Sequence, residues 1–462
     1  MDGSSGATAL LGMAGFVAGA QIDHGGEVWI LVETTADVAG CVACGVRAVG
    51  NGRRIVRVRD LPAGDRPVVL IWAKRTWRCV EAACVVGSFT EETDAIGPRS
   101  SLTERARSEI CRRVGADGHS VAQVAAAFGV GWHTAMAAVR DHGRPRVDHL
   151  SRIGAPTALG LDETSFLKAN HTHGTMLITG FVDLDRSQLI DVVAGRSAAA
   201  VSDWLETKPT RWKAGIATVA LDPFRAYAKG IRQGLPDARQ VVDHFHAIRL
   251  ANAALDDVRR RVQQDTVGHR GRKGDPLYRI RRLLLVAHER LTERGWQRIE
   301  DGLRVGDPAG EVGAAYLAKE LLREVYATRS VKLARRRLAR FYRHCHQADM
   351  AELARLANTI KSWETEILNY HHTGLTNAAT EGTNLLIKKI KRVGHGFRNF
   401  DNYRLRLLLH CGVSWKPRPV APIRGRQPAL GSATGLLARC SVWVWRRRVR
   451  SLGSSSRWCC RI

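Results

Sequence analysis

Three absences narrow the class of protein. The 462-residue chain has no apolar run of about 18 residues or more, so we expect no membrane span. The apolar stretch at 7–20 has no positively charged segment before it, and we therefore expect no signal peptide and a cytoplasmic location. The cysteines lack the dense spacing of a secreted disulfide scaffold, because four of the ten cluster and the others are scattered. This distribution favours metal ligation in a reducing compartment.

Acidic residues are also scarce relative to basic ones. Asp and Glu number 44 against 71 Lys and Arg, which gives a net charge of +27 and a pI near 10.4. Such an excess is typical of proteins that work on a polyanion, so double-stranded DNA is the expected partner; a merely soluble basic surface is the alternative. From 413 to 462 there are eleven Lys or Arg and no Asp or Glu, which predicts a basic, disordered tail.

Residues 1–98 are predicted to form a β-rich zinc-binding domain. Its four clustered thiols occur as two pairs: Cys41 with Cys44, and Cys79 with Cys84. Strand-like runs at 53–59 and 68–72 lie between the pairs, and their pairing in a sheet would bring the pairs together. Four protein ligands leave no open position, so the Zn²⁺ would be structural; thiols that only fill a small core are the alternative.

Residues 99–145 have the pattern of a helix-turn-helix. Ser120 can cap the first helix with Gln123 in the capping-box position, and a second helix is predicted at 132–139. The recognition helix would present three residues to DNA: Trp132, His133 and Thr134. An ordinary helical hairpin is the alternative. A linker near 143–146, rich in Pro, Arg and Gly, is expected to separate this part from the next domain.

Three carboxylates in residues 150–412 are predicted to form one metal site. Asp162 ends the strand-like run 158–161, and Asp222 ends the run 216–221. Side chains at strand ends emerge together at the edge of a sheet. Glu381 heads a predicted helix, and oxygen ligands of this kind select Mg²⁺ or Mn²⁺. Asp243, after a short strand at 239–243, is the alternative to Asp222.

The helix that begins near Glu381 also carries cations. Glu381, Asn384 and Lys388 would share one face, and three apolar residues are expected to anchor the helix: Leu385, Leu386 and Ile390. Four basic residues would hold DNA backbone near the metals: Lys388, Lys389, Lys391 and Arg392. A solvated helix face is the alternative for them, while Asn384 could orient a ligand or a phosphate.

The order of elements predicts an α/β multidomain protein with a ribonuclease-H-like core. Three strands are followed by alternating helices and strands, with carboxylates at the ends of the first and fourth strands. A basic, almost wholly helical stretch at about 247–369 then separates the sheet from the helix of Glu381. We interpret it as an insertion into the catalytic domain.

The motifs, in their order and spacing over roughly 10–412, resemble the ISL3 family of bacterial insertion-sequence transposases. The matching stretches are "RVRDLPAG" between the cysteine pairs, the helix-turn-helix, "LGLDETSF", "VALDPFRAY", "LPDARQVVDHFH" and "TNAATEGTNLLIKKIKRVGHGFRNFDNYRLRLL". The resemblance implies a DDE transposase with Asp162, Asp222 and Glu381 as its acidic triad. Transposases hold two DNA ends, so a homodimer or larger assembly on DNA is expected.

Strand cleavage and strand transfer at one site would follow from two divalent ions held by the triad. We expect Asp162 to bridge both ions, Asp222 to hold one and Glu381 the other. The main alternative is a catalytically inactive, transposase-derived DNA-binding protein or regulator, which would need neither the carboxylates nor the metal. A ribonuclease would share the metal site but would leave the two amino-terminal DNA-binding modules unexplained.

Overall fold

The computed structural model describes residues 4–172 and 174–415. These residues, up to Ser414, belong to one compact unit of the chain. Nearly all of the predicted tail, 413–462, lies outside the described residues. Within the described part, none of the helices combines the length and the apolar character that crossing a membrane requires.

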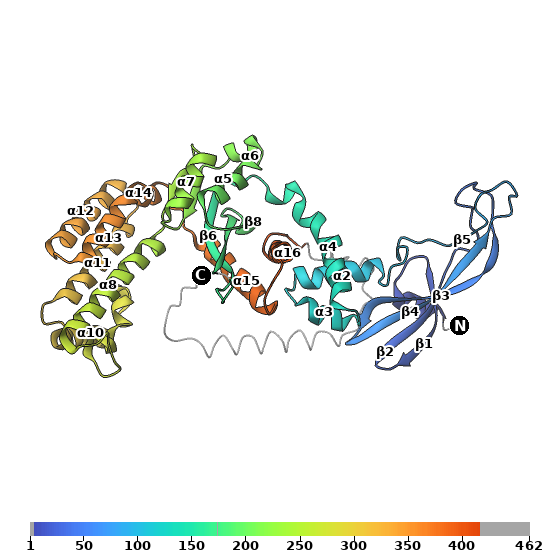
Figure 1. The fold of residues 1–462 in the computed structure, drawn as a ribbon, viewed down its shortest axis with the longest axis horizontal. Helices are drawn as coiled ribbons and strands as arrows, with labels where there is room; N and C mark the ends of the chain where they lie inside the picture. The colour runs from blue at the N-terminus through green and yellow to red at the C-terminus, as the bar shows by residue number, and fades with distance from the viewer. Residues whose placement is uncertain (1–3, 173, 416–462) are drawn as a thin grey trace, which may run out of the picture. The chain divides into compact units, whose positions relative to one another are not determined.

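The amino-terminal part is a sheet in the order β1-β2-β4-β3, with β5 paired to β4 (Figure 1). A short helix precedes it; the bounds are α1 Ser4–Leu11, β1 Phe16–His24, β2 Glu27–Thr34, β3 Val49–Ala63, β4 Arg66–Arg78 and β5 Ser88–Thr90. The long β3 and β4 are antiparallel. Alternate side chains of β3 and β4, such as Val58 and Trp72, are buried in a common core, as the period of a strand requires.

Three helices follow: α2 Glu104–Gly115, α3 Val121–Ala127 and α4 Trp132–Asp148. The predicted capping box is confirmed, because the Ser120 hydroxyl accepts from the Gln123 N–H and the Gln123 side chain accepts from the Ser120 N–H. Gly129, in the turn before α4, has φ +63°, and a Cβ there would meet an Arg59 guanidinium nitrogen of β3 at 2.2 Å. Glycine therefore satisfies both the turn and the close contact.

The predicted linker at 143–146 is wrong, because α4 runs through it to Asp148 and contains Pro145. The reason is tertiary packing against α16 (Phe400–Cys411). A Cβ on Gly143 would lie 2.9 Å from a Leu409 methyl of α16, so the two helices touch at this glycine. Burial of α4 against α16 outweighs the helix-breaking tendency of Gly and Pro.

The central sheet has the order β10-β9-β6-β7-β8. Its strands are β6 Ala158–Leu167, β7 Met176–Asp183, β8 Gln188–Ala194, β9 Thr218–Leu221 and β10 Arg239–Val241. The first three form an antiparallel meander, whereas β9 and β10 run parallel to β6. The parallel crossovers pass through α5 Ala198–Glu206, α6 Thr210–Ala214 and α7 Arg225–Gly234.

Helices cover both faces of this sheet, α5 and α7 on one side and α15 (Ala378–Val393) and α16 on the other (Figure 1). Phe181 of β7 stacks on Trp204 of α5 at 3.7 Å between ring centroids. Phe166 of β6 stacks on Tyr403 of α16 at 5.1 Å. The even-numbered residues of β6 from 160 to 166 therefore face α15 and α16, whereas Leu161 and Glu163 face the opposite side of the sheet.

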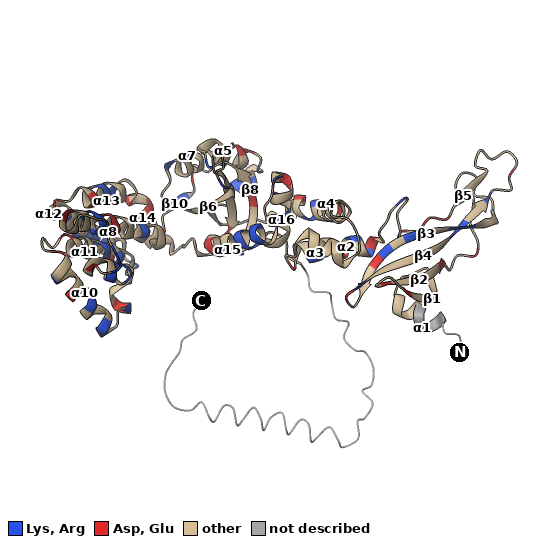
Figure 2. Ribbon diagram, turned by 60° about the horizontal axis from the view of Figure 1, so that its bottom comes forward, with Lys and Arg blue, Asp and Glu red and all other residues tan. Residues whose placement is uncertain are grey.

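Between β10 and α15 the chain is helical, as the sequence predicts. The helices are α8 His244–Val267, α9 Pro276–Ile280, α10 Glu293–Gly306, α11 Glu311–Tyr326, α12 Val331–Gln347, α13 Ala351–Ser362 and α14 Glu364–Thr373. One apolar core continues from the sheet residues Leu161 and Leu221 along α8 into these helices. Figure 2 shows Lys and Arg on the insertion, on α15 and on β3, so the positive charge is spread over the described parts.

Candidate active site

Two aspartates lie side by side at the centre of the sheet. Leu161 of β6 and Leu221 of the parallel β9 are register partners, so the next residues, Asp162 and Asp222, occupy neighbouring positions. Neighbouring strands are about 4.8 Å apart, which brings the two carboxylates to one site. Asp222 follows the last residue of β9, as predicted.

Asp162 does not end its strand, and in this detail the prediction is wrong. β6 continues to Leu167, and Asp162 pairs with Gly180 of β7 inside the ladder. Burial alternates along this run, because Thr164 and Phe166 are buried and Glu163 and Ser165 are half-buried, so the strand continues where the first apolar run stops. The neighbouring Glu163 points to the opposite face, where it pairs with Arg196 at 3.3 Å. Excluding Glu163 from the site on the ground of strand alternation agrees with this geometry.

Helix α15 is held against β6 by a close approach and by an amide. A Cβ on Gly160 would lie 2.0 Å from the Thr380 hydroxyl oxygen, so only glycine lets the start of α15 come this near. One turn later, the Asn384 side chain donates to a carboxylate oxygen of Asp162 and accepts from the Thr164 hydroxyl. Asn384 is buried, and it sets the position of α15 relative to Asp162.

The predicted anchors of α15 are only partly right. Leu385 and Leu386 are 67% and 41% exposed, whereas Ile387 and Ile390 are buried. The helical periodicity is as expected, but the buried face is rotated because Thr383, Asn384 and Ile387 point at the sheet. Two leucines are thereby left on the outer surface of the helix.

The third carboxylate is joined to the second through a histidine that sequence reasoning passed over. His246 Nε2 lies 2.7 Å from Asp222 Oδ1 and 3.9 Å from Glu381 Oε1. The two carboxylate oxygens are therefore no farther apart than the sum of these distances. Arg249, one turn later on α8, donates to the other oxygen of Asp222 at 3.0 Å. The signal was the "DHFH" cluster, which begins α8 directly after β10.

Burial and mutual repulsion of the carboxylates dominate the electrostatics of this group. Burial, and then the charge of Asp222, raise the pKa of Asp162 to about 6. Burial and the charge of Asp243 likewise raise the pKa of Glu381. Burial lowers the pKa of His246, but the adjacent Asp222 more than compensates, so that the pKa is raised overall. Oε1 of Glu381 is buried and has no hydrogen-bond partner in the described part of the chain. A hard divalent cation fits such oxygen donors.

Asp243 has a different environment. It is 2% exposed, and one of its oxygens accepts from the His246 N–H as the cap of α8. The other oxygen accepts from the Asn377 N–H, just before α15. Both oxygens are thus engaged by backbone donors, and the carboxylate ties α8 to the start of α15.

The four predicted DNA-contacting cations of α15 do not all face solvent. Lys388, Lys389 and Arg392 are exposed. The Lys391 ammonium instead donates to the carbonyl and hydroxyl oxygens of Ser165, the latter at 3.0 Å. Lys391 therefore joins the middle of α15 to β6, and three cations remain on the surface.

The four predicted zinc ligands come together. The Sγ atoms of Cys41, Cys44, Cys79 and Cys84 all lie within 4.8 Å of one another. The distances Cys41–Cys84 and Cys44–Cys79 are both 3.6 Å, near the value of about 3.8 Å that a tetrahedron with Zn–S bonds of about 2.3 Å implies. Backbone N–H groups of Cys44 and Ala43 lower the pKa of Cys41 to about 6, whereas burial and the neighbouring thiols raise the pKa values of Cys79 and Cys84 in spite of their backbone donors. The chemistry of the donor set thus fits Zn²⁺.

The three predicted recognition residues lie at the start of α4. Trp132 is 41% exposed, His133 is exposed and Thr134 is half-buried. The first N–H groups of α4, like those of any helix, have no carbonyl partner within the helix, and the N-cap residue Gly131 supplies no side-chain acceptor for them. The arrangement suits a negatively charged ligand.

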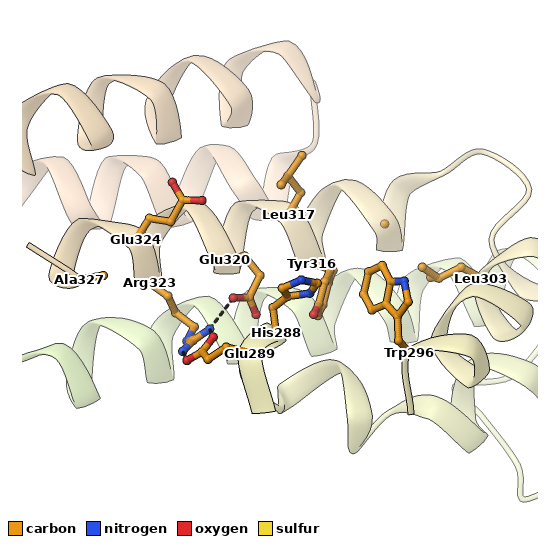
Figure 3. A pocket seen from close by; sticks show the side chains of 11 residues that line it. His288, Glu289, Trp296, Leu303, Tyr316, Leu317, Glu320, Arg323, Glu324 and Ala327 are labelled. Atoms are coloured by element: carbon orange, nitrogen blue, oxygen red, sulfur yellow. Dashed lines mark hydrogen bonds and ion pairs between the residues drawn. The ribbon is translucent and has the colours of Figure 1, made fainter. Parts of the chain in front are cut away.

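A separate cavity of about 570 Å³ lies in the helical insertion, between α10 and α11 (Figure 3). Figure 3 shows Trp296 and Tyr316 on its wall and an ion pair between Arg323 and Glu320. Arg323 also pairs with Glu289, so its charge is matched by two carboxylates of the protein itself. The cavity has no unmatched charge at Arg323 that would call for an ionic ligand.

Three family models match the chain. The DDE_Tnp_ISL3 model, described as a transposase, matches residues 159–407. The zinc-finger of transposase IS204/IS1001/IS1096/IS1165 matches 37–84, and the helix-turn-helix domain of transposase family ISL3 matches 91–143. These three stretches contain the acidic group, the four thiols, and the helices α2 and α3 with most of α4, respectively.

Two curated proteins are similar over much of their length. The transposase for insertion sequence element IS1001 of Bordetella parapertussis is 27% identical over 399 residues, which cover 83% of this chain and 92% of that protein. The transposase for IS1557 of Mycobacterium tuberculosis (strain ATCC 25618 / H37Rv) is 27% identical over 290 residues, which cover 58% of this chain and 63% of that protein.

Proposed function

The chain belongs to the ISL3 family of insertion-sequence transposases, which bind DNA and cut and transfer its strands, and we propose that Asp162, Asp222 and Glu381 are its catalytic triad. The observation that carries the proposal is the register of β6 and β9, which sets Asp162 beside Asp222 at adjacent parallel strands. The hydrogen bond from Asn384 to Asp162 then ties the helix of Glu381 to the same point.

The proposal includes a ribonuclease-H-like core. In support, the sheet consists of an antiparallel meander, β8-β7-β6, extended by the parallel strands β9 and β10. The order of strands and helices is the one expected from the sequence, with α8–α14 between β10 and α15 as the insertion. A structural Zn²⁺ in the amino-terminal part would hold the two cysteine pairs together.

Mg²⁺ or Mn²⁺ is the proposed cofactor of the acidic site. When bound, such ions supply an activated water and neutralise the charge that develops on the phosphate. Asp162, Asp222 and Glu381 would together hold the ions. His246 and Arg249 keep Asp222 oriented, and Asn384 does the same for Asp162. Asp222 is preferred to Asp243, because the strand register places Asp222 beside Asp162, whereas Asp243 is 2% exposed and ties α8 to the start of α15.

DNA contacts are proposed on two surfaces. Trp132, His133 and Thr134 would contact DNA at the start of α4, where the N–H groups are uncapped. The exposed cations of α15 would hold backbone phosphates near the acidic site: Lys388, Lys389 and Arg392. A homodimer or larger assembly would serve to hold two DNA ends.

The test is metal-dependent cleavage of a labelled duplex that carries the element's own end. Asp162→Asn and Glu381→Gln should each abolish nicking in Mg²⁺ and leave DNA binding intact, because they remove metal ligands without removing the DNA-binding parts. Glu163→Gln, on the opposite face of β6, is the matched control and should retain cleavage. If the unaltered protein binds the end but never cuts in Mg²⁺ or Mn²⁺, the inactive DNA-binding alternative replaces this proposal.

A further inference from the structure

A cleft of about 410 Å³ lies where the helix-turn-helix meets the catalytic part of the chain. One wall comes from α3 and the start of α4, including Trp132 and Met136. The other wall is the loop 394–399 between α15 and α16, with Phe397 and Arg398, together with Arg406 of α16. The cleft is therefore built from the DNA-reading helices and from the segment that follows the helix of Glu381.

The two walls are joined by direct contacts. Arg140 of α4 donates to the Asn402 side chain of α16 at 3.2 Å. Arg406 donates to the His119 carbonyl, before α3, at 3.0 Å. His410 of α16 lies 2.8 Å from the Gly115 carbonyl at the end of α2. These three contacts tie α16 to the helix-turn-helix beside the cleft.

Arg406 has the unmatched charge of this cleft. The residue is only 2% exposed, and its Nε atom is buried without a hydrogen-bond partner among the described residues. Burial lowers the pKa of Arg406 to about 10, and no carboxylate contributes to that shift. Arg398 is a second cation at the cleft, and none of the residues that line the cleft is Asp or Glu. A buried guanidinium without a carboxylate is costly unless a ligand supplies the negative charge.

The opposite wall is favourable for the same kind of ligand. Helix α4 has 17 residues, its N-terminus is at Trp132, and its cap makes no side-chain hydrogen bond. The positive end of the helix dipole and the free N–H groups bind anions. Trp132 and Phe397 supply flat apolar surface beside these donors. Cations next to aromatic rings match a sugar-phosphate chain.

We propose that this cleft binds one DNA backbone phosphate, held between Arg406 of the catalytic part and the N-terminus of α4, with the adjoining deoxyribose against Trp132 and Phe397. The inference rests on the DNA-binding function and adds a contact that bridges the reading helices and the catalytic part. The cavity between α10 and α11 differs in this respect, because there Arg323 is neutralised by Glu289 and Glu320.

The experiment measures binding of the full chain to end-carrying duplexes in which single phosphates are replaced by neutral methylphosphonates. The unaltered protein should lose affinity on the order of tenfold when the bound phosphate is neutralised. Arg406→Gln should bind unmodified DNA with an affinity lower by a similar factor. Neutralising the same phosphate should then cause no further loss of affinity. The slope of log K against log salt should become shallower by about 0.9, the value for one phosphate contact.

The controls separate this site from general charge and from misfolding. Arg343→Gln, on the exposed face of α12, removes the same charge and should still show the methylphosphonate effect. Arg398→Gln changes an exposed residue of the cleft and serves as the second variant if Arg406→Gln fails to fold. It should reduce the affinity lost when the same phosphate is neutralised. A single sensitive position on the end assigns the phosphate to end DNA. Equal loss on a duplex without the end assigns it to target DNA. Unchanged affinity and salt slope in both cleft variants would overturn the proposal.

Discussion

Asp162→Asn should abolish cleavage and yet stabilise the metal-free protein. The reason is that the carboxylate is buried beside Asp222, and its pKa is raised from 3.8 to about 6. Above pH 6 the charged carboxylate therefore destabilises the folded state by about 2 pKa units, or about 3 kcal/mol at 1.36 kcal/mol per unit. Asparagine removes the charge and keeps the shape.

The hydrogen bonds of Asp162 reduce this gain. One carboxylate oxygen accepts from the Glu163 N–H at 2.7 Å, and an amide oxygen can do the same. The other faces the Asn384 amide, which must turn over so that its oxygen meets the new NH₂ group and its own NH₂ meets the Thr164 hydroxyl. We therefore expect a net gain of about 1–3 kcal/mol in the opening free energy of β6.

Hydrogen exchange of peptides from β6, followed by mass spectrometry in EDTA, measures this local stability. Above pH 6 the variant should exchange more slowly than the unaltered protein. As the pH falls through about 6 towards 3.8, Asp162 becomes protonated and the difference should disappear. Saturating Mg²⁺ should reverse the order, because only the unaltered site gains binding energy.

Asp191→Asn is the matched control on the same sheet. Asp191 of β8 pairs with Arg404 at 2.7 Å and accepts from the Trp204 indole at 3.0 Å. Neutralising Asp191 removes the nearest carboxylate of Arg404, so the same chemical change should destabilise the protein. If Asp162→Asn also destabilises the metal-free protein at pH 8, the interpretation of a cation site formed by buried, mutually repelling carboxylates is refuted.

Three shorter predictions concern the zinc site, the contact of α15 with β6, and the histidine. Cys44→Ser, or a chelator, should release one Zn²⁺ per chain. Hydrogen exchange should become faster in β3 and β4, while β6 stays protected. An equal loss of protection in both sheets would contradict a local structural role of the zinc. Gly160→Ala places a methyl group 2.0 Å from the Thr380 oxygen and should lower the free energy of unfolding by about 1–3 kcal/mol. Cleavage should be abolished while binding of the DNA end is retained. Thr380→Ala in the same chain removes the clashing oxygen and should restore part of the cleavage activity. His246→Ala should raise the Mg²⁺ concentration needed for half-maximal cleavage about 10–100-fold, because Asp222 loses its neighbour at 2.7 Å. An unchanged dependence of cleavage on Mg²⁺ concentration would exclude a positioning role for His246.

Local signals in the sequence were reliable where a few neighbouring residues decide the structure. The capping box of Ser120 and Gln123 formed as predicted, and Cys41 and Cys44 lie in one thiol cluster. The strand ending at Leu221 and the helix of Glu381 are likewise readable from periodicity. Each of these features depends on residues within about one or two turns of each other.

Predictions failed where distant packing outweighed local preference. Gly143 and Pro145 suggested a linker, but contact with Leu409 keeps α4 helical there. Leu385 and Leu386 were expected to be anchors, but the sheet is contacted by Asn384 and its neighbours instead. In both cases the partner lies more than 200 residues away in the chain, and periodicity carries no information about it.

The sequence by itself determined the kinds of residue in the site and the elements that carry them: carboxylates after apolar strands, thiols in pairs, and cations along one helix. Only the tertiary structure decided that His246 lies between Asp222 and Glu381, that Lys391 donates hydrogen bonds to Ser165, and that Arg406 has no carboxylate beside it. The physical reason is that charge interactions depend on distance and burial in three dimensions, and both are set by contacts between segments far apart in the chain.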